Sequence, residues 1–276
     1  MILFPNAKIN IGLDITARRP DGYHEIETVM CPVGWADILE IVPGNSGKTT
    51  LTVTGRKVDC PVEKNLVMKA FRALETAVGH DLPPVDIYLR KIVPDGAGLG
   101  GGSSDAAFAL KGINEVLSLG FTPDKLAEIA STIGADCPFF IYNTPMLATG
   151  IGTTLSPINL NLSGLTVVIV KPDESVPTAA AYRGITPVQP PVPLSNRITG
   201  NIETWMGNVT NAFEATVGRQ IAAIDEIKRR LTEIGAVYTA MSGSGSAVFG
   251  LFKSDILADD IAHIFPGMAT YTGPIG

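Results

Sequence analysis

The densest chemical signal in the sequence is a run of glycines that ends in two serines. Five of the seven residues from 96 to 102 are glycine, and Ser103, Ser104 and Asp105 follow directly. So few side chains let backbone N–H groups approach phosphate oxygens, and a helix that begins there adds its dipole. The run therefore predicts a phosphate-binding loop. A flexible linker is disfavoured because an amphipathic helical pattern follows at once.

Two other groups of residues have side chains suited to catalysis. Asp136 precedes the apolar residues 137–140, where a carboxylate serves either as a reactive group or as a simple helix N-cap. Lys8 and Asn10 share the polar side of a segment in which apolar and polar residues alternate. Neither group is specific by itself.

A histidine and a second glycine-containing turn are weaker candidates. His24 lies in the polar turn of residues 18–25, where a surface histidine is the usual finding. The Ser-Gly-Ser-Gly-Ser stretch of residues 242–246 also fits an ordinary hairpin turn. These signals gain meaning only if the fold brings them together.

Periodic patterns indicate the elements that position these residues. Residues 9–15 alternate as a half-buried strand, and the glycine run lies between an expected strand at 85–92 and an expected helix at 106–117. Asn65 and Thr122 are natural N-caps. The other expected elements are strands at residues 25–33, 37–42, 165–171, 237–241 and 247–252 and helices at residues 65–78, 123–134, 219–234 and 254–265, the last capped by Ser254.

Composition limits the class of protein. The chain has 276 residues, of which 45% are hydrophobic and 17% charged, and the net charge is −6. A sizeable core is expected, and disorder, a membrane span and general nucleic-acid binding are not. Strands and helices in each half predict an α+β fold with two domains, residues 1–150 and 151–276. Three cysteines without a C-x-x-C pair, and an N-terminus without signal features, favour a cytoplasmic protein.

Taken together, three motifs resemble those of the superfamily of kinases named for galactose, homoserine, mevalonate and phosphomevalonate, the GHMP kinases. They are Pro5-Asn-Ala-Lys8-Ile-Asn10 with Asp21-Gly-Tyr-His24, then Gly98-Leu-Gly-Gly-Gly-Ser-Ser-Asp-Ala-Ala107, and Met241-Ser-Gly-Ser-Gly245. Within the superfamily, Arg18-Arg-Pro-Asp-Gly-Tyr-His-Glu25 and Ala135-Asp-Cys-Pro-Phe-Phe140 are similar to the family that acts on 4-diphosphocytidyl-2-C-methyl-D-erythritol.

This resemblance implies transfer of the γ-phosphoryl group of ATP to the 2-hydroxyl of that substrate, in the non-mevalonate route to isoprenoid precursors. It implies the two-domain GHMP-kinase fold with its active site in the cleft between the domains. It also implies Mg²⁺, for which we name no protein ligand. Asp136 would take the hydroxyl proton or orient the hydroxyl. Lys8 would keep that carboxylate ionised and offset charge on the phosphoryl group.

The remaining site residues also follow from the resemblance. Tyr23 would stack on the cytosine, His24 would read its edge, and Tyr182 would be a second aromatic contact. Asn10, Thr178 and Gly243 complete the expected substrate site. The expected ATP site comprises Asn65 and Leu66 beside the adenine and, along the phosphates, Pro94, Gly96, Gly98, Leu99, Gly100, Gly101, Gly102, Ser103 and Ser104.

Two alternatives stay open. Another kinase of the superfamily, such as a homoserine or mevalonate kinase, is disfavoured by Asp21-Gly-Tyr-His24. A relative that senses a ligand without turnover is disfavoured by the presence of Lys8, Asp136 and the complete glycine-rich loop. In each case the expected partners are small molecules.

Overall fold

A computed structural model describes residues 1–275, and all twelve strands of this part of the chain belong to three four-stranded sheets. Contacts divide the chain into two units. Unit 1 contains Met1–Ala7, Trp35–Asp95 and Gly100–Thr144, and unit 2 contains Lys8–Gly34, Gly96–Leu99 and the chain from Pro145 onward. The units are interleaved in sequence, whereas the sequence predicts a single boundary near residue 150. Thr28–Met30 of the N-terminal half pair with Met146–Ala148, and this pairing places part of the N-terminal half in unit 2.

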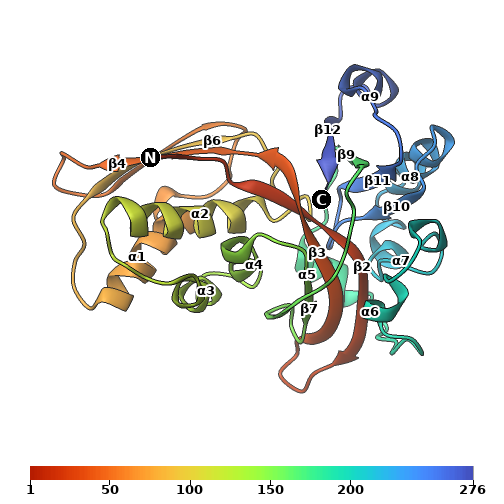
Figure 1. Ribbon diagram of the computed structural model, residues 1–276, viewed down its shortest axis with the longest axis horizontal. Coiled ribbons are helices and arrows are strands. Elements are labelled where there is room, and N and C mark those ends of the chain that lie inside the picture. The colour runs from red at the N-terminus through yellow and green to blue at the C-terminus, as the bar shows by residue number, and fades with distance from the viewer. Residues whose placement is uncertain (276) are drawn as a thin grey trace. The chain divides into compact units, whose positions relative to one another are not determined.

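Unit 1 is a sheet with helices packed against it (Figure 1). Its strands lie in the order β1 (Ile2–Leu3), β4 (Ile38–Pro43), β6 (Val85–Lys91) and β5 (Thr50–Gly55), and only β5 and β6 pair in parallel. Its helices are α1 (Leu66–Val78), α2 (Gly101–Val116), α3 (Pro123–Ser131) and α4 (Cys137–Tyr142), with a 3₁₀ turn at Val62–Lys64.

Helix α2 begins earlier than the sequence predicts. The expected start was residue 106, but α2 begins at Gly101, directly after Gly100 with a φ of 71°. Glycine is a poor helix former, yet a first turn packed on a sheet tolerates it. Two of the loop glycines therefore belong to the helix, and their N–H groups are those of its first turn.

Unit 2 holds the other two sheets. One has the order β2 (Asn6–Arg18), β3 (His24–Ala36), β7 (Met146–Thr149) and β8 (Thr154–Pro157), with the ends of β2 and β3 at Asn6–Ala7 and Trp35–Ala36 counted in unit 1. The other has the order β10 (Tyr238–Met241), β11 (Val248–Phe252), β9 (Leu165–Lys171) and β12 (Ala269–Ile275). The β10–β11 hairpin confirms the turn expected at residues 242–246.

The helices of unit 2 are α5 (Thr178–Arg183), α6 (Leu194–Arg197), α7 (Glu214–Val217), α8 (Ala223–Glu233) and α9 (Ala258–Ile264), with a 3₁₀ turn at Ile202–Thr204. The predicted helix at 219–234 is too long at its start, where a turn links α7 to α8. The predicted cap Ser254 is wrong, because the residue before α9 is Leu257, without a side-chain cap.

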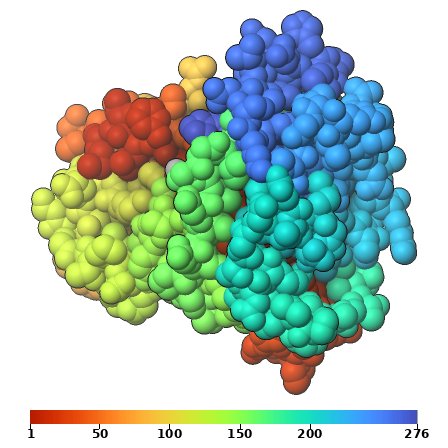
Figure 2. Space-filling model, turned by 45° about the vertical axis from the view of Figure 1, so that its right-hand side comes forward, coloured from red at the N-terminus to blue at the C-terminus, as the bar shows by residue number. Residues whose placement is uncertain are grey.

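The proline-rich residues 187–193 form a surface connection, as expected, and Val188 is 65% exposed. The backbone N–H of Val188 donates to the Ile15 carbonyl of β2. Figure 2 shows the teal chain around this region on the outside of the molecule. Among residues 1–275, no helix has the length and apolar composition needed to cross a membrane.

Candidate active site

The end of the glycine-rich loop that lies in unit 1 is an uncapped helix start. No side chain caps the N-terminus of α2, and its first turn consists of Gly101, Gly102, Ser103 and Ser104. The first N–H groups of a helix have no partner inside the helix, and the helix dipole makes this end attractive to anions. The structure thus gives the predicted phosphate loop a set of backbone donors.

The tip of the loop, Gly96–Leu99, belongs to unit 2. The carbonyl of Gly98 accepts hydrogen bonds from Lys8 Nζ at 3.1 Å and from Ser242 Oγ at 2.8 Å. Gly98 has a φ of 75°, and a Cβ there would lie 2.0 Å from the Ser242 carbonyl oxygen. Only glycine fits this close approach.

The predicted residues Lys8, Asn10 and Gly243 gather at the same place in unit 2. Lys8 Nζ donates to Asn10 Oδ1 at 2.5 Å, and a Cβ on Gly243 would lie 3.2 Å from that oxygen. The backbone N–H of Asn10 donates to Ser242 Oγ at 3.1 Å, and its amide nitrogen donates to Thr28 Oγ1 at 3.0 Å. Lys8 and Asn10 are buried, so packing holds their orientation.

Asn211 supports this group and was missed from the sequence. Its amide nitrogen donates to the carbonyls of Met241 at 2.7 Å and Gly243 at 2.8 Å, while its Oδ1 accepts from the N–H of Phe213. A buried asparagine thus holds the turn after β10 in place. An asparagine 30 residues before the turn has no local pattern that links it to that turn.

Asp136 stands at the start of α4 in unit 1 and does not act as a conventional N-cap. Its φ and ψ are −84° and −13°, and its side chain makes no capping hydrogen bond. The next residue, Cys137, is buried and hydrogen-bonded to Ser103 of α2. Burial raises the pKa of the Cys137 thiol to about 11, so it stays neutral. Asp136 is therefore fixed close to the uncapped start of α2.

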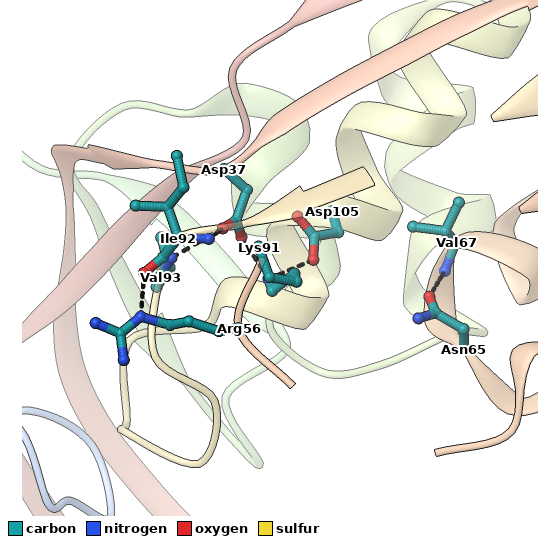
Figure 3. A network of polar contacts seen from close by, with 8 residues as sticks. All are labelled: Asp37, Arg56, Asn65, Val67, Lys91, Ile92, Val93 and Asp105. Carbon is teal, nitrogen blue, oxygen red and sulfur yellow. Dashed lines mark hydrogen bonds and ion pairs between the residues drawn. The ribbon is translucent and has the colours of Figure 1, made fainter. Parts of the chain in front are cut away.

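A cavity of about 270 Å³ lies beside the predicted adenine residues of unit 1. Asn65 caps α1 by accepting the N–H of Val67 at 2.9 Å, and this cap orients the helix start at the cavity (Figure 3). The lining residues are Val58, Asp59, Cys60, Lys64, Asn65, Leu66, Lys91, Asp95, Gly102 and Asp105. Asn65, Leu66 and Gly102, three of the expected ATP-binding residues, thus share one cavity wall.

Lys91, at the end of β6, is a buried cation that sequence reasoning missed. Its ammonium is ion-paired with Asp37 and, at 2.6 Å, with Asp105 of α2 (Figure 3). Burial lowers the pKa of Lys91, but attraction to the two carboxylates outweighs it, and the pKa lies above its ordinary value. Burial raises the pKa of Asp105 to about 7, against the attraction of Lys91.

A signal for this cluster was present in the sequence. In β6 the alternating residues Val85, Ile87, Leu89 and Lys91 are all buried. A lysine on the apolar side of a strand requires an acidic partner, since burying an unpaired ammonium is very costly. The pattern thus predicts a buried carboxylate, but not which one.

A second cavity, of about 620 Å³, lies in unit 2. His24 and Tyr182 stack at its wall with ring centroids 4.9 Å apart, and the Tyr182 ring also meets Phe213 edge-on at 4.7 Å. Tyr23 lies beside them and is 61% exposed. One face of Tyr182 is therefore occupied by His24, and Tyr23 is the most exposed ring.

Polar and charged groups complete this second cavity. Thr178 lines it, and its hydroxyl lies 3.0 Å from Ser244 Oγ of the turn after β10. Arg18 and Arg183 also line it, and neither guanidinium has an ion pair within residues 1–275. The structure thus gathers Tyr23, His24, Thr178 and Tyr182 in unit 2. Asp136 lies in unit 1 and Lys8 in unit 2, so their pairing stays a prediction.

Two protein-family models match this chain and define its class. The model of the GHMP kinases N terminal domain matches residues 65–144, and that of the GHMP kinases C terminal domain matches residues 196–268. The first match includes the uncapped start of α2 and Asp136. The class is that of the GHMP kinases, which confirms the predicted α+β fold.

Individual relatives narrow the class. A 4-diphosphocytidyl-2-C-methyl-D-erythritol kinase of Parabacteroides distasonis is 51% identical, over 92% of both chains. One of Porphyromonas gingivalis is 47% identical, over 95% of this chain and 96% of the relative. A crystal structure of 4-(cytidine 5'-diphospho)-2C-methyl-D-erythritol kinase matches with a TM-score of 0.85 at 31% identity, covering 100% of this chain and 99% of that one. The chain therefore belongs to the family of 4-diphosphocytidyl-2-C-methyl-D-erythritol kinases.

Proposed function

We propose that this chain transfers the γ-phosphoryl group of ATP to the 2-hydroxyl of 4-diphosphocytidyl-2-C-methyl-D-erythritol, a step of the non-mevalonate route to isoprenoid precursors. The likeness to relatives of that name, over 92% or more of this chain, supports the substrate. The cavity of each unit and, in unit 1, the start of α2 support the roles of individual residues.

ATP would bind to unit 1. The adenine would lie beside Asn65 and Leu66 in the 270 Å³ cavity, and the phosphates would receive hydrogen bonds from the first turn of α2. Gly102 lines the cavity and also belongs to that turn, so a nucleotide bound there would have its phosphates near free N–H groups.

The cytidyl group would bind to unit 2. A cytosine ring can stack on the exposed Tyr23, while His24, held flat against Tyr182, presents ring nitrogens to the edge of the base. Arg18 and Arg183 supply positive charge to the same cavity. An anionic diphosphate suits a cavity whose lining has two guanidiniums and no carboxylate.

Asp136 would accept the proton of the attacking hydroxyl or orient that hydroxyl, and Lys8 would offset charge on the phosphoryl group. Phosphoryl transfer depends mainly on positioning and electrostatic stabilisation. The two side chains suit these tasks because Asp136 is not used as a helix cap and Lys8 is oriented by Asn10 and Gly98. Their joint action is part of the proposal.

The residues at the start of α2 fit a Mg²⁺ ion. Ser104 Oγ and Asp105 Oδ1 are buried oxygens without a hydrogen-bond partner in the described part of the chain. Residues 1–275 contain no group of three His, Cys, Asp or Glu side chains able to hold a metal. Such a site suits Mg²⁺, which keeps waters and phosphate oxygens as ligands and takes one or two from protein. When bound, it would neutralise phosphate charge.

We place the reaction in the cytoplasm, with small molecules as its partners. Cys31, Cys60 and Cys137 are free thiols, and the net charge of −6 does not suit a nucleic-acid surface.

Acceptor-dependent ADP formation tests the proposal. Purified protein with ATP, Mg²⁺ and the cytidyl substrate should release ADP, whereas homoserine or mevalonate in its place should not. ADP release with homoserine or mevalonate instead would assign the chain to another activity of the superfamily. Binding of the cytidyl substrate without ADP release would indicate a non-catalytic relative.

A further inference from the structure

The residues that lead from β6 into the glycine-rich loop are attached to one buried carboxylate. Asp37 lies between β3 and β4 and is fully buried. Its Oδ1 accepts the N–H groups of Ile92 at 2.5 Å and Val93 at 2.8 Å, while its Oδ2 is bound by the Lys91 ammonium (Figure 3). One side chain therefore holds three consecutive residues.

The same ammonium reaches the other end of the loop. Lys91 Nζ donates to Asp105 at 2.6 Å, and Asp105 lies in α2, four residues after its first residue Gly101. The strand end before the loop and the helix start after it are therefore joined by one cation. Residues 92–100, which connect them, have both their ends fixed within unit 1.

A further contact holds the backbone of the strand end from the other side. Arg56 Nε donates to the Ile92 carbonyl at 2.8 Å, and the Arg56 N–H donates to the Lys91 carbonyl at 3.0 Å. A Cβ on Gly55 would lie 2.2 Å from the Lys91 carbonyl oxygen, so the chains meet closely. Arg56 thus binds the carbonyl groups of this segment, whereas Asp37 accepts the N–H groups of Ile92 and Val93.

We propose that Asp37 is the positioning residue of the glycine-rich loop, and that it sets nucleotide affinity through Lys91 and the backbone of Ile92 and Val93. The inference rests on the proposed function, in which that loop binds the phosphates of ATP. Asp37 does not line the cavity and is fully buried, so it acts without touching the nucleotide. A loop fixed at both ends loses less entropy when it orders around phosphates.

The Asp37→Asn variant separates the two sets of bonds. The amide oxygen can still accept the N–H groups of Ile92 and Val93, whereas the amide nitrogen places a donor against the Lys91 ammonium. We expect ADP to bind at least about tenfold more weakly by calorimetric titration, because the new donor displaces the Lys91 ammonium, which joins the strand end to Asp105 of α2. The KM for the cytidyl substrate should stay unchanged.

Asp86→Asn is the matched control. Asp86 lies on β6 and accepts a hydrogen bond from Thr50 Oγ1 at 2.6 Å, but it contacts neither the loop nor Lys91. The amide oxygen of the asparagine can still accept this bond, so the variant should keep its ADP affinity. If folded Asp37→Asn protein binds ADP as the unsubstituted protein does, Asp37 has only a structural role and the inference is wrong. If the unsubstituted protein itself does not bind ADP, the proposed function fails instead.

Hydrogen exchange on the unsubstituted protein tests the inference without a variant that must fold. The amides of Ile92 and Val93 should exchange as slowly as those of β6, because a buried acceptor holds them. The amides of exposed Ser46 and Gly47, in the loop after β4, provide the fast reference. Exchange of the Ile92 and Val93 amides at that fast rate would show that Asp37 does not hold them and would contradict the inference.

Discussion

Replacing Asp136 with asparagine separates a catalytic role of this carboxylate from a role as a helix cap. In the structure the Asp136 side chain makes no capping hydrogen bond, and α4 is only six residues long. Asparagine keeps the size of the side chain. Because no capping hydrogen bond is lost, the free energy of unfolding should change by less than the roughly 1 kcal/mol that loss of an N-cap typically costs.

The effect on turnover should be far larger. Loss of a positioned general base slows a reaction by about 10²–10⁴-fold, which corresponds to about 2.7–5.4 kcal/mol in the barrier. Initial rates of ADP formation at saturating ATP and cytidyl substrate measure this loss. Calorimetric ADP titration should show unchanged binding, because the start of α2 is unaltered.

Thr122→Ala is the control for a real cap. Thr122 Oγ1 accepts the N–H of Lys125 at the start of α3, at 3.3 Å. Its loss should cost about 0.5–1 kcal/mol of stability and leave turnover unchanged. A folded Asp136→Asn protein whose turnover stays within about threefold of the original would refute the reasoning, since the barrier would then not depend on this base.

Three further outcomes are expected. In Gly101→Val, a Cβ would lie 3.2 Å from Val93 Cγ1 and 3.5 Å from Lys91 Nζ; ATP affinity should fall at least about tenfold, because the branched side chain crowds the start of α2, and an unchanged titration would contradict the phosphate loop. In Tyr182→Ala, His24 loses the ring that orients it and the site loses an aromatic contact; the cytidyl substrate should bind more weakly, by at most the roughly 1–3 kcal/mol of one aromatic contact with a base. This should appear as a raised KM for that substrate with the KM for ATP unchanged. The folded-state pKa of Asp105, about 7, exceeds its ordinary value of 3.8, so its contribution to stability is complete below about pH 4 and is lost as the pH rises towards 7. Denaturant unfolding at several pH values should show that the free energy of unfolding falls less over this range in Asp105→Asn. An unchanged pH dependence would exclude Asp105 as the source of the fall.

Local periodicity explains why most elements were predictable. Residues 65–78 combine a helical apolar pattern with the N-cap Asn65, and the structure has α1 at Leu66–Val78. Strands β6 and β9 likewise lie where alternating or continuous apolar residues predict them. The start of α2 was placed too late because the low helix propensity of glycine hides a first turn stabilised by tertiary packing.

Contacts between distant residues explain what the sequence did not predict. The Lys91 ion pair with Asp37 spans 54 residues, and no local pattern selects that acid among the others. The stack of His24 on Tyr182 likewise joins two segments that lie far apart in the chain. The polar turn around His24 therefore predicts a surface position but not the contact with Tyr182 of α5, which leaves His24 half-buried.

The position of the new phosphate in the product tests the central claim most directly. Cytidyl substrate labelled with ¹³C at C2 of the methylerythritol is incubated with the protein, ATP and Mg²⁺, and the product is examined by ¹³C and ³¹P NMR. The account predicts a new phosphomonoester coupled to the labelled carbon, an intact cytidyl diphosphate and one ADP for each phosphoester. ADP with free inorganic phosphate, or a phosphoester without coupling to C2, would contradict it.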